Sequence, residues 1–167
     1  MKKILPNIPN ILSIIRLILI PFILVFFILD NIWVAIILTI IASITDFLDG
    51  RIARKFNLTS DLGAKLDIIA DKFFAGILII SLIIKNVIFT IPLIGELIIA
   101  TINIISYYLK KNPKTKYIGK IKATILYVTI IIGLVSLLNC SLNFLIIPFI
   151  IATAILQIFS IITYIKI

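Results

Sequence analysis

The sequence contains no histidine and only one cysteine, Cys140. The missing histidines exclude Ser-His-Asp triads, Cys-His dyads and zinc sites built on imidazole. A single cysteine excludes a disulfide within the chain. Any metal ion bound by this chain must therefore be held by oxygen ligands.

Charged residues are also scarce. They make up 14% of the 167 residues, whereas 62% are apolar, and the mean hydropathy is +1.30. Soluble domains are about 45–50% apolar and about 25% charged, so this chain has too few polar side chains to cover a surface that faces water. The apolar runs are continuous and do not alternate, which argues against a transmembrane β-barrel. The composition predicts a helical membrane protein in which residues 1–167 form a single membrane domain.

Six apolar runs are long enough to cross a membrane as helices. They cover residues 10–29, 32–50, 66–84, 87–109, 122–138 and 142–165. The fold class expected from them is an all-α bundle of six transmembrane helices. An even number of spans places both termini on the same side of the membrane.

The basic residues predict which side this is, because cytoplasmic loops of membrane proteins are rich in lysine and arginine. With the termini in the cytoplasm, thirteen basic residues fall in cytoplasmic segments and only Lys85 falls outside. We therefore expect a multi-pass protein of the cell (cytoplasmic) membrane with both termini in the cytoplasm. This topology and anionic lipid headgroups explain the net charge of +9, so nucleic-acid binding is not expected.

Carboxylates are few but clustered, since five of the seven acidic residues lie between positions 46 and 71. Asp46 and Asp49 are three residues apart and Asp67 and Asp71 are four apart, so each pair shares one face of its helix. If the segment between the pairs folds back, four carboxylates converge at the cytoplasmic edge of the membrane. Such a cluster needs cations, and it suits two Mg²⁺ or Mn²⁺ ions that clamp a phosphoryl group. The alternative is a set of solubilising helix-end charges paired with the nearby basic residues Arg51, Arg54 and Lys65.

The residues between the aspartates fit a phosphate-binding site. Gly50 and Gly63 let a ligand approach the helix backbone closely, and Ala53 keeps that face open. Arg54 offers a bidentate fork for a phosphate. The whole stretch reads Asp46-x2-Asp49-Gly50-x2-Ala53-Arg54-x8-Gly63-x3-Asp67-x3-Asp71. At all eight fixed positions it resembles the signature of the CDP-alcohol phosphatidyltransferase family.

The resemblance implies a fold, a reaction and a site. Members of this family have six transmembrane helices, with the signature on the second and third, and they are typically homodimers. They transfer a phosphatidyl group, or a similar substituted phosphate, from a CDP-alcohol to the hydroxyl of a second alcohol and release CMP. By position, two divalent metal ions would be surrounded by Asp46, Asp49, Asp67 and Asp71, of which Asp71 would also be the catalytic base. The CDP-binding pocket would be formed by Gly50, Ala53, Arg54 and Gly63.

Weaker similarities to bacterial phosphatidylglycerophosphate synthases, a branch of this family, indicate the acceptor. They lie in residues 7–17, 43–50 and 119–124. Two departures stand out, because Ile68 replaces a proline and Gly95-Glu96 replaces an Arg-Glu pair. The expected donor is CDP-diacylglycerol and the expected acceptor is glycerol 3-phosphate, which together give phosphatidylglycerophosphate, an intermediate of phospholipid biosynthesis.

An acceptor that carries a phosphate needs cationic and polar side chains near the metal ions. The candidates are Asn10, Ser13, Arg16, Lys120 and Lys122. Arg16 stands out because it lies within an apolar run, where an ionised side chain is costly and usually functional. Glu96, the one carboxylate of the fourth run, is a candidate partner for Arg16 or for a lysine.

Two alternatives stay open at this point. Within the family, the acceptor can be phosphatidylglycerol, as in cardiolipin synthases, or inositol phosphate or serine. From a different class, a cation transporter would also place carboxylates in the membrane. Transporters of that kind hold such groups near the midplane and often have repeated halves, whereas here the aspartates lie at one edge.

The charge distribution makes a testable prediction of topology. Single cysteines introduced at Lys85 or Asn139 in a Cys140→Ala background should react with an impermeant thiol reagent in intact cells. A cysteine at Lys114 should not react until the membrane is opened. Labelling of position 114 in intact cells would contradict the predicted orientation.

Overall fold

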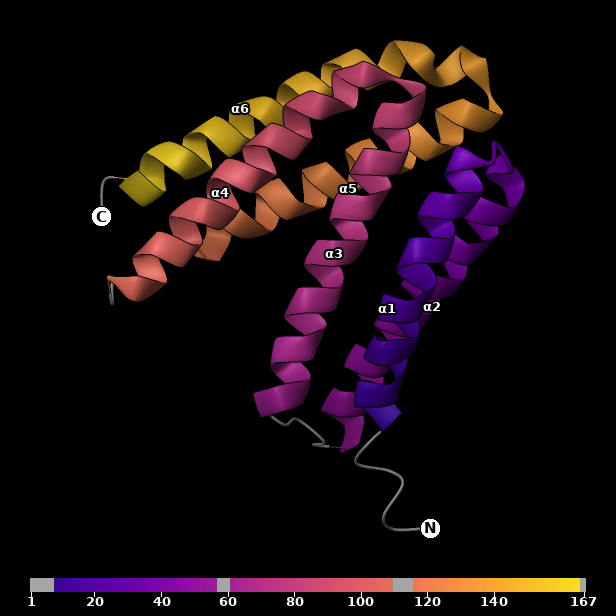
Figure 1. Cartoon of the computed structure of the whole chain (residues 1–167). Helices are drawn as coiled ribbons and strands as arrows, with labels where there is room; N and C mark the ends of the chain where they lie inside the picture. The colour runs from indigo at the N-terminus through magenta and orange to yellow at the C-terminus, as the bar shows by residue number, and fades with distance from the viewer. Residues whose placement is uncertain (1–7, 57–60, 110–115, 166–167) are drawn as a thin grey trace. The chain divides into compact units, whose positions relative to one another are not determined.

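The computed structural model describes the backbone of residues 8–56, 61–109 and 116–165, and in these ranges the side chains other than those of 8–10, 49–50, 52–56, 61–68, 107, 116–117 and 165. The described chain is almost wholly helical (Figure 1). Its α-helices are α1 (Ile8–Ile28), α2 (Ile32–Phe56), α3 (Asp61–Lys85), α4 (Thr90–Tyr108), α5 (Lys116–Leu138) and α6 (Ile146–Ile165). Two short 3₁₀ helices, η2 (Val87–Phe89) and η3 (Cys140–Leu145), precede α4 and α6. The expected all-α class is confirmed.

The helices follow the six apolar runs, but their ends differ from the ends of the runs. α2 continues to Phe56 and α3 begins at Asp61, so polar residues beyond the apolar runs are helical as well. α6 begins only at Ile146, because the side chain of Asn139 accepts a hydrogen bond from the backbone N–H of Ser141 at 3.1 Å and caps η3. A helix satisfies its backbone groups internally and can continue from lipid into water, so a change in hydropathy does not by itself end a helix.

Several helices are suited to a membrane. Among the described residues, four stretches are long and apolar enough to cross it, namely Ile11–Ile28, Val87–Ser106, Ile118–Leu138 and Cys140–Tyr164. Ile32–Leu48 is a shorter apolar stretch. These stretches are consistent with a membrane protein, whereas the count of six spans and the cytoplasmic termini stay predictions.

The side chains are distributed as in a protein surrounded by lipid. Helix α1 buries one stripe of residues at alternating spacings of three and four, which are Ser13, Arg16, Ile20, Ile23 and Phe27. The same spacing recurs on α6, where the buried residues are Ile146, Ile150, Thr153, Gln157 and Ser160. The other faces expose large apolar side chains such as Ile18, Phe22 and Ile158. Because lipid solvates isoleucine well, small and polar residues between the helices must hold them together.

The chain divides into two compact units, Met1–Ser81 and Leu82–Ile167. In the first unit, α1 and α2 pack against each other as an antiparallel hairpin (Figure 1). The turn is short because Asp30 adopts a left-handed conformation with a φ of 60°. In the turn, the N–H of Asn31 donates to the carbonyl of Phe26 at 2.9 Å and that of Asp30 to the carbonyl of Phe27 at 3.3 Å. This is the Schellman arrangement, which satisfies the last carbonyls of a helix.

In the second unit, α6 packs against both α4 and α5. The hydroxyls of Thr129 on α5 and Thr153 on α6 lie 2.7 Å apart. Each hydroxyl is also 2.8 Å from the carbonyl four residues earlier in its own helix. The pair therefore links two helices without leaving a hydroxyl exposed to lipid.

A charged network joins α4, α5 and α6. The ammonium of Lys122 donates to both carboxylate oxygens of Glu96, at 2.6 and 2.8 Å. The amide nitrogen of Gln157 donates to Glu96 Oε1 at 3.1 Å and to the carbonyl of Pro92 at 2.9 Å. The carboxylate is thus both neutralised and hydrogen-bonded, as a charge held away from water must be. The expectation that Glu96 pairs with Arg16 or a lysine is confirmed for a lysine, Lys122.

Gly95 makes room for this network. A Cβ atom at position 95 would overlap the side-chain amide of Gln157. That amide is fixed by two hydrogen bonds, so it cannot move aside without leaving buried polar groups unsatisfied. The absence of a side chain at position 95 is therefore a packing requirement of this bundle.

We expect Gly95→Ala to lower the free energy of unfolding by about 1–3 kcal/mol, the usual cost of adding a methyl group to a well-packed site. The matched control is Gly76→Ala on α3, where a Cβ would meet nothing within 4 Å in the described structure. Alanine's better helix propensity should there leave stability unchanged or raise it by up to about 1 kcal/mol. Thermal unfolding in detergent measures both, and equal melting temperatures would contradict the packing described for Gln157.

Candidate functional site

The eight signature residues lie on two successive helices of the first unit. α2 carries Asp46, Asp49, Gly50, Ala53 and Arg54, and α3 carries Gly63, Asp67 and Asp71. Their placement on the second and third helices follows the prediction from sequence. The predicted position at the helix ends is wrong for the described pair, because Asp46 lies ten residues before the end of α2 and Asp71 ten residues after the start of α3. Of the predicted site residues, those whose side chains lie outside the described ones are Asn10, Asp49, Gly50, Ala53, Arg54, Gly63 and Asp67.

The two signature aspartates with described side chains meet at Arg16. The Nη1 atom of Arg16 lies 2.6 Å from Asp46 Oδ1 and donates to Asp71 Oδ1 at 2.6 Å. The Arg16 side chain is 0% exposed, whereas the side chains of Asp46 and Asp71 are 45% and 44% exposed. One guanidinium on α1 therefore joins a carboxylate of α2 to a carboxylate of α3.

The spacing of small and polar residues explains how the three side chains meet. Arg16 falls on the buried stripe of α1, one turn after the buried Ser13. On α2, Asp46 continues a buried stripe formed by Ala35, Thr39 and Ala42. Small side chains in this stripe let α1 and α2 approach closely, so the arginine reaches Asp46. On α3, Asp71 directly follows the fully buried Ala70.

The energetics of the pairing favour a permanent arrangement. A guanidinium withdrawn from solvent is tolerated only when it is paired with acceptors. Distances of 2.6 Å are at the short end for charge-assisted hydrogen bonds, which are roughly twice as strong as neutral ones. Because both carboxylates remain nearly half exposed, solvent or a ligand can still approach them from their open side.

The arrangement brings together hard oxygen ligands from two helices, which is the chemistry that Mg²⁺ and Mn²⁺ prefer. Among the side chains that the structure describes, no third carboxylate joins the pair. The alternative of helix-end ion pairs would use Arg51, Arg54 and Lys65, of which only Arg51 has a described side chain. Its guanidinium lies over the ring of Phe47, 5.5 Å from the ring centroid. The described part of the cluster is thus held by a buried arginine of another helix.

The predicted acceptor-binding residues are found in different surroundings. Ser13 and Arg16 are buried on α1, and Arg16 is paired with the carboxylates of Asp46 and Asp71. On α5, Lys120 is exposed, while Lys122 is buried and paired with Glu96. A role of these residues in binding the acceptor stays a prediction.

Two features of the structure were not predicted from the sequence. The pairing of Arg16 with Asp46 and Asp71 was not expected, although a lone arginine in an apolar run and the signature aspartates were visible signals. The contact of Gln157 with Glu96 was also missed. An amide within an otherwise apolar last helix was the signal there, because such a group needs a partner inside the bundle.

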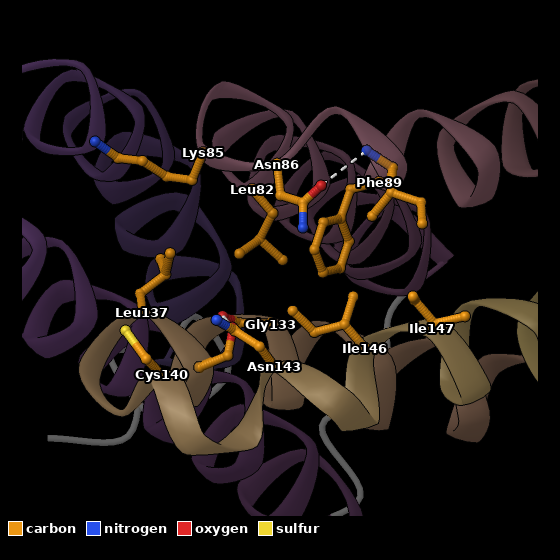
Figure 2. A pocket seen from close by; sticks show the side chains of 12 residues that line it. Leu82, Lys85, Asn86, Phe89, Gly133, Leu137, Cys140, Asn143, Ile146 and Ile147 are labelled. Carbon is orange, nitrogen blue, oxygen red and sulfur yellow. Dashed lines mark hydrogen bonds between the residues drawn. The ribbon is translucent and has the colours of Figure 1, made fainter.

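A cavity of about 560 Å³ opens in the second unit, between the ends of α3 and α5 and the start of α6 (Figure 2). Leu82, Phe89 and Ile146 reach toward it, and Gly133 forms part of its wall. The side chain of Asn86 is engaged in accepting a hydrogen bond from Ile88 N at 3.2 Å. The lining contains none of the predicted site residues, so the cavity is not part of the candidate site.

The chain is similar to known proteins of one family. The model of the CDP-alcohol phosphatidyltransferase family matches residues 6–164. A protein of Rickettsia felis named CDP-diacylglycerol–glycerol-3-phosphate 3-phosphatidyltransferase is 44% identical over 89 residues, which are 52% of this chain and 49% of the relative. A protein of the same name from Aquifex aeolicus is 43% identical over 75 residues, 45% of this chain and 42% of the relative.

A longer match is found in Wigglesworthia glossinidia brevipalpis. Its protein of the same name is 34% identical over 154 residues, 78% of this chain and 85% of the relative. The chain spans about half the length of the Rickettsia felis relative. No solved structure matches the chain.

Proposed function

The chain belongs to the CDP-alcohol phosphatidyltransferase family, and from this premise we propose that it transfers the phosphatidyl group of CDP-diacylglycerol to the hydroxyl of glycerol 3-phosphate. The products are CMP and phosphatidylglycerophosphate. The observation that carries the proposal is the complete signature on α2 and α3, with Asp46 and Asp71 brought to one point. The choice of glycerol 3-phosphate rests on the names of the relatives.

The family generally uses divalent metal ions, and the residues of this chain fit them. The donor set is composed of carboxylates, the two described ones are half exposed, and the chain has no histidine to favour a softer ion. The residues proposed to hold two Mg²⁺ or Mn²⁺ ions are Asp46, Asp49, Asp67 and Asp71. When bound, the ions would neutralise the diphosphate of the donor, which otherwise repels an oxygen nucleophile.

The chain's own residues would bind the donor and move one proton. Gly50, Ala53 and Gly63 leave space for the CDP group beside the helix backbone, and Arg54 binds the diphosphate through its fork of donors. Asp71 accepts the proton of the acceptor hydroxyl while that oxygen bonds to the phosphorus of the phosphatidyl group. The bond from this phosphorus to the CMP oxygen breaks, and CMP leaves with the electron pair.

The acceptor's own phosphate needs a counter-charge. Lys120 is exposed on α5, and its ammonium has no part in the Glu96 network described above. We assign the phosphate first to Lys120, with Lys122, Asn10, Ser13 and Arg16 as the further candidates. This ranking follows from charge, because Glu96 already neutralises Lys122.

The membrane setting follows from the substrates. A lipid donor enters from the bilayer and a charged acceptor from water, so the signature should lie at the cytoplasmic edge of six spans in the cell membrane. Lysine and arginine counts support this orientation. A homodimer is proposed from the family alone.

The proposed reaction can be tested by CMP release. Purified protein with CDP-diacylglycerol and Mg²⁺ or Mn²⁺ should release CMP when glycerol 3-phosphate is added. Phosphatidylglycerol, inositol, inositol phosphate and serine form the comparison panel. If inositol or serine alone supports release, the acceptor is wrong and the family assignment stands; if no acceptor does and liposomes show cation flux, the protein is a transporter.

Individual carboxylates should differ in their effects. Asp46→Asn and Asp67→Asn remove metal ligands and should abolish transfer, with a loss of metal affinity. Asp71→Asn should lower kcat by about 10²–10⁴-fold, the usual contribution of a general base, while donor binding is better preserved. Assays of CMP release and CDP binding separate the two effects.

The control for these variants is Asp30→Asn. Asp30 lies in the turn between α1 and α2, and asparagine tolerates its left-handed backbone at least as well. Its activity should stay within about twofold of wild type, as is usual for surface sites. An active Asp67→Asn enzyme, or an inactive but folded Asp30→Asn enzyme, would show that the site lies elsewhere.

A further inference from the structure

The contact between Arg16 and the aspartates has an unusual geometry. A single nitrogen, Nη1, lies 2.6 Å from an oxygen of Asp46 and 2.6 Å from an oxygen of Asp71. The two oxygens are therefore no farther apart than twice that distance. They belong to different helices, so the guanidinium sets the separation of the two carboxylates.

The three side chains of this contact differ in their exposure to solvent. The Arg16 side chain is 0% exposed, while each carboxylate is nearly half exposed. A solute that approaches from solvent or from the membrane edge thus meets the carboxylates first, with the guanidinium behind them. Because Arg16 is enclosed, it cannot exchange its carboxylate partners for water, so any other cation must share these carboxylates with it.

Arg16 and a divalent cation would both be attracted to the same carboxylates and would repel each other. Together the two described carboxylates and the guanidinium carry one negative charge, and without the guanidinium two like charges would face each other at short range. A divalent cation beside the same carboxylates meets the positive charge of Arg16 a few ångströms away. The low dielectric of this surrounding makes both terms stronger than they would be in water.

We propose that Arg16 is a positioning residue that acts as a built-in counter-ion of the aspartate site. It holds Asp46 and Asp71 together when no divalent cation is bound, and it weakens the binding of that cation. The inference rests on the proposed function, in which these aspartates hold the metal ions. Arg16 thereby keeps the two carboxylates together between turnovers and allows the divalent cation to dissociate.

The test compares Mn²⁺ affinity and stability in three variants. Arg16→Met removes the charge and retains an apolar side chain of similar length; Arg16→Lys retains the charge; Lys72→Met removes an exposed positive charge next to Asp71 in sequence. Mn²⁺ dissociation constants are measured in detergent by electron paramagnetic resonance, without donor. Melting temperatures are measured in chelator and in saturating Mn²⁺.

Arg16→Met should bind Mn²⁺ about tenfold or more tightly than wild type, a change of about 1.4 kcal/mol or more. Its melting temperature in chelator should fall, and Mn²⁺ should restore it by more than in wild type. Arg16→Lys and Lys72→Met should stay within about threefold of the wild-type affinity, because the first keeps the charge and the second removes one that solvent screens.

Unchanged or weaker Mn²⁺ binding by Arg16→Met would overturn the proposal, since a purely structural arginine predicts that result. If Arg16→Met folds only with Mn²⁺, the proposal is supported. If Arg16→Met does not fold at all, the Mn²⁺ affinity of Arg16→Lys decides. A change of more than about tenfold in that affinity overturns the proposal, and a near-wild-type affinity supports it. A wild-type protein that binds no Mn²⁺ also overturns it. CMP release by wild type, measured in parallel, tests the proposed function separately.

Discussion

Charge that cannot reach water must be compensated within the protein, and this constraint organises each unit of the chain. In the first unit the buried guanidinium of Arg16 joins α1 to α2 and α3 through Asp46 and Asp71. In the second, Glu96 on α4 is held by Lys122 of α5 and Gln157 of α6. Since lipid is as good a solvent for isoleucine as another helix is, apolar area alone does not select partners. These polar contacts do, because each pairs a charged group with specific partners on other helices.

The same constraint relates the packing of the first unit to its chemistry. A group of carboxylates on two apolar helices repels itself and resists dehydration. A buried cation behind the cluster lowers that cost without covering the open side of the carboxylates. The fold thus supports a group of carboxylates on two apolar helices.

Much of this could be predicted from the sequence, and the failures have physical causes. Continuous apolar runs predicted the helices, and the spacing of eight residues predicted which two helices carry the signature. Contacts between helices that are distant in the sequence could not be predicted, because hydropathy indicates which face of a helix is buried but not which residue of another helix lies opposite. Arg16 and Asp71 are 55 residues apart, and the fit of Gly95 to Gln157 depends on how α4 and α6 pack. Helix ends were misjudged for a related reason, since hydrogen bonds and caps, rather than hydropathy, end α2 and begin α6.

The tight turn at Asp30 has a consequence for the order in which the protein is built. Because only a few residues separate α1 from α2, the hairpin closes its contacts as soon as its second arm has been synthesised, at little cost in loop entropy. At that stage Arg16 already has Asp46 as a partner, so the hairpin can enter the bilayer with this arginine neutralised. Asp67 and Asp71 arrive with α3, so the four aspartates of the signature can meet only after the hairpin has formed. Within the first unit, the anionic cluster is therefore completed after the hairpin, when α3 has been synthesised.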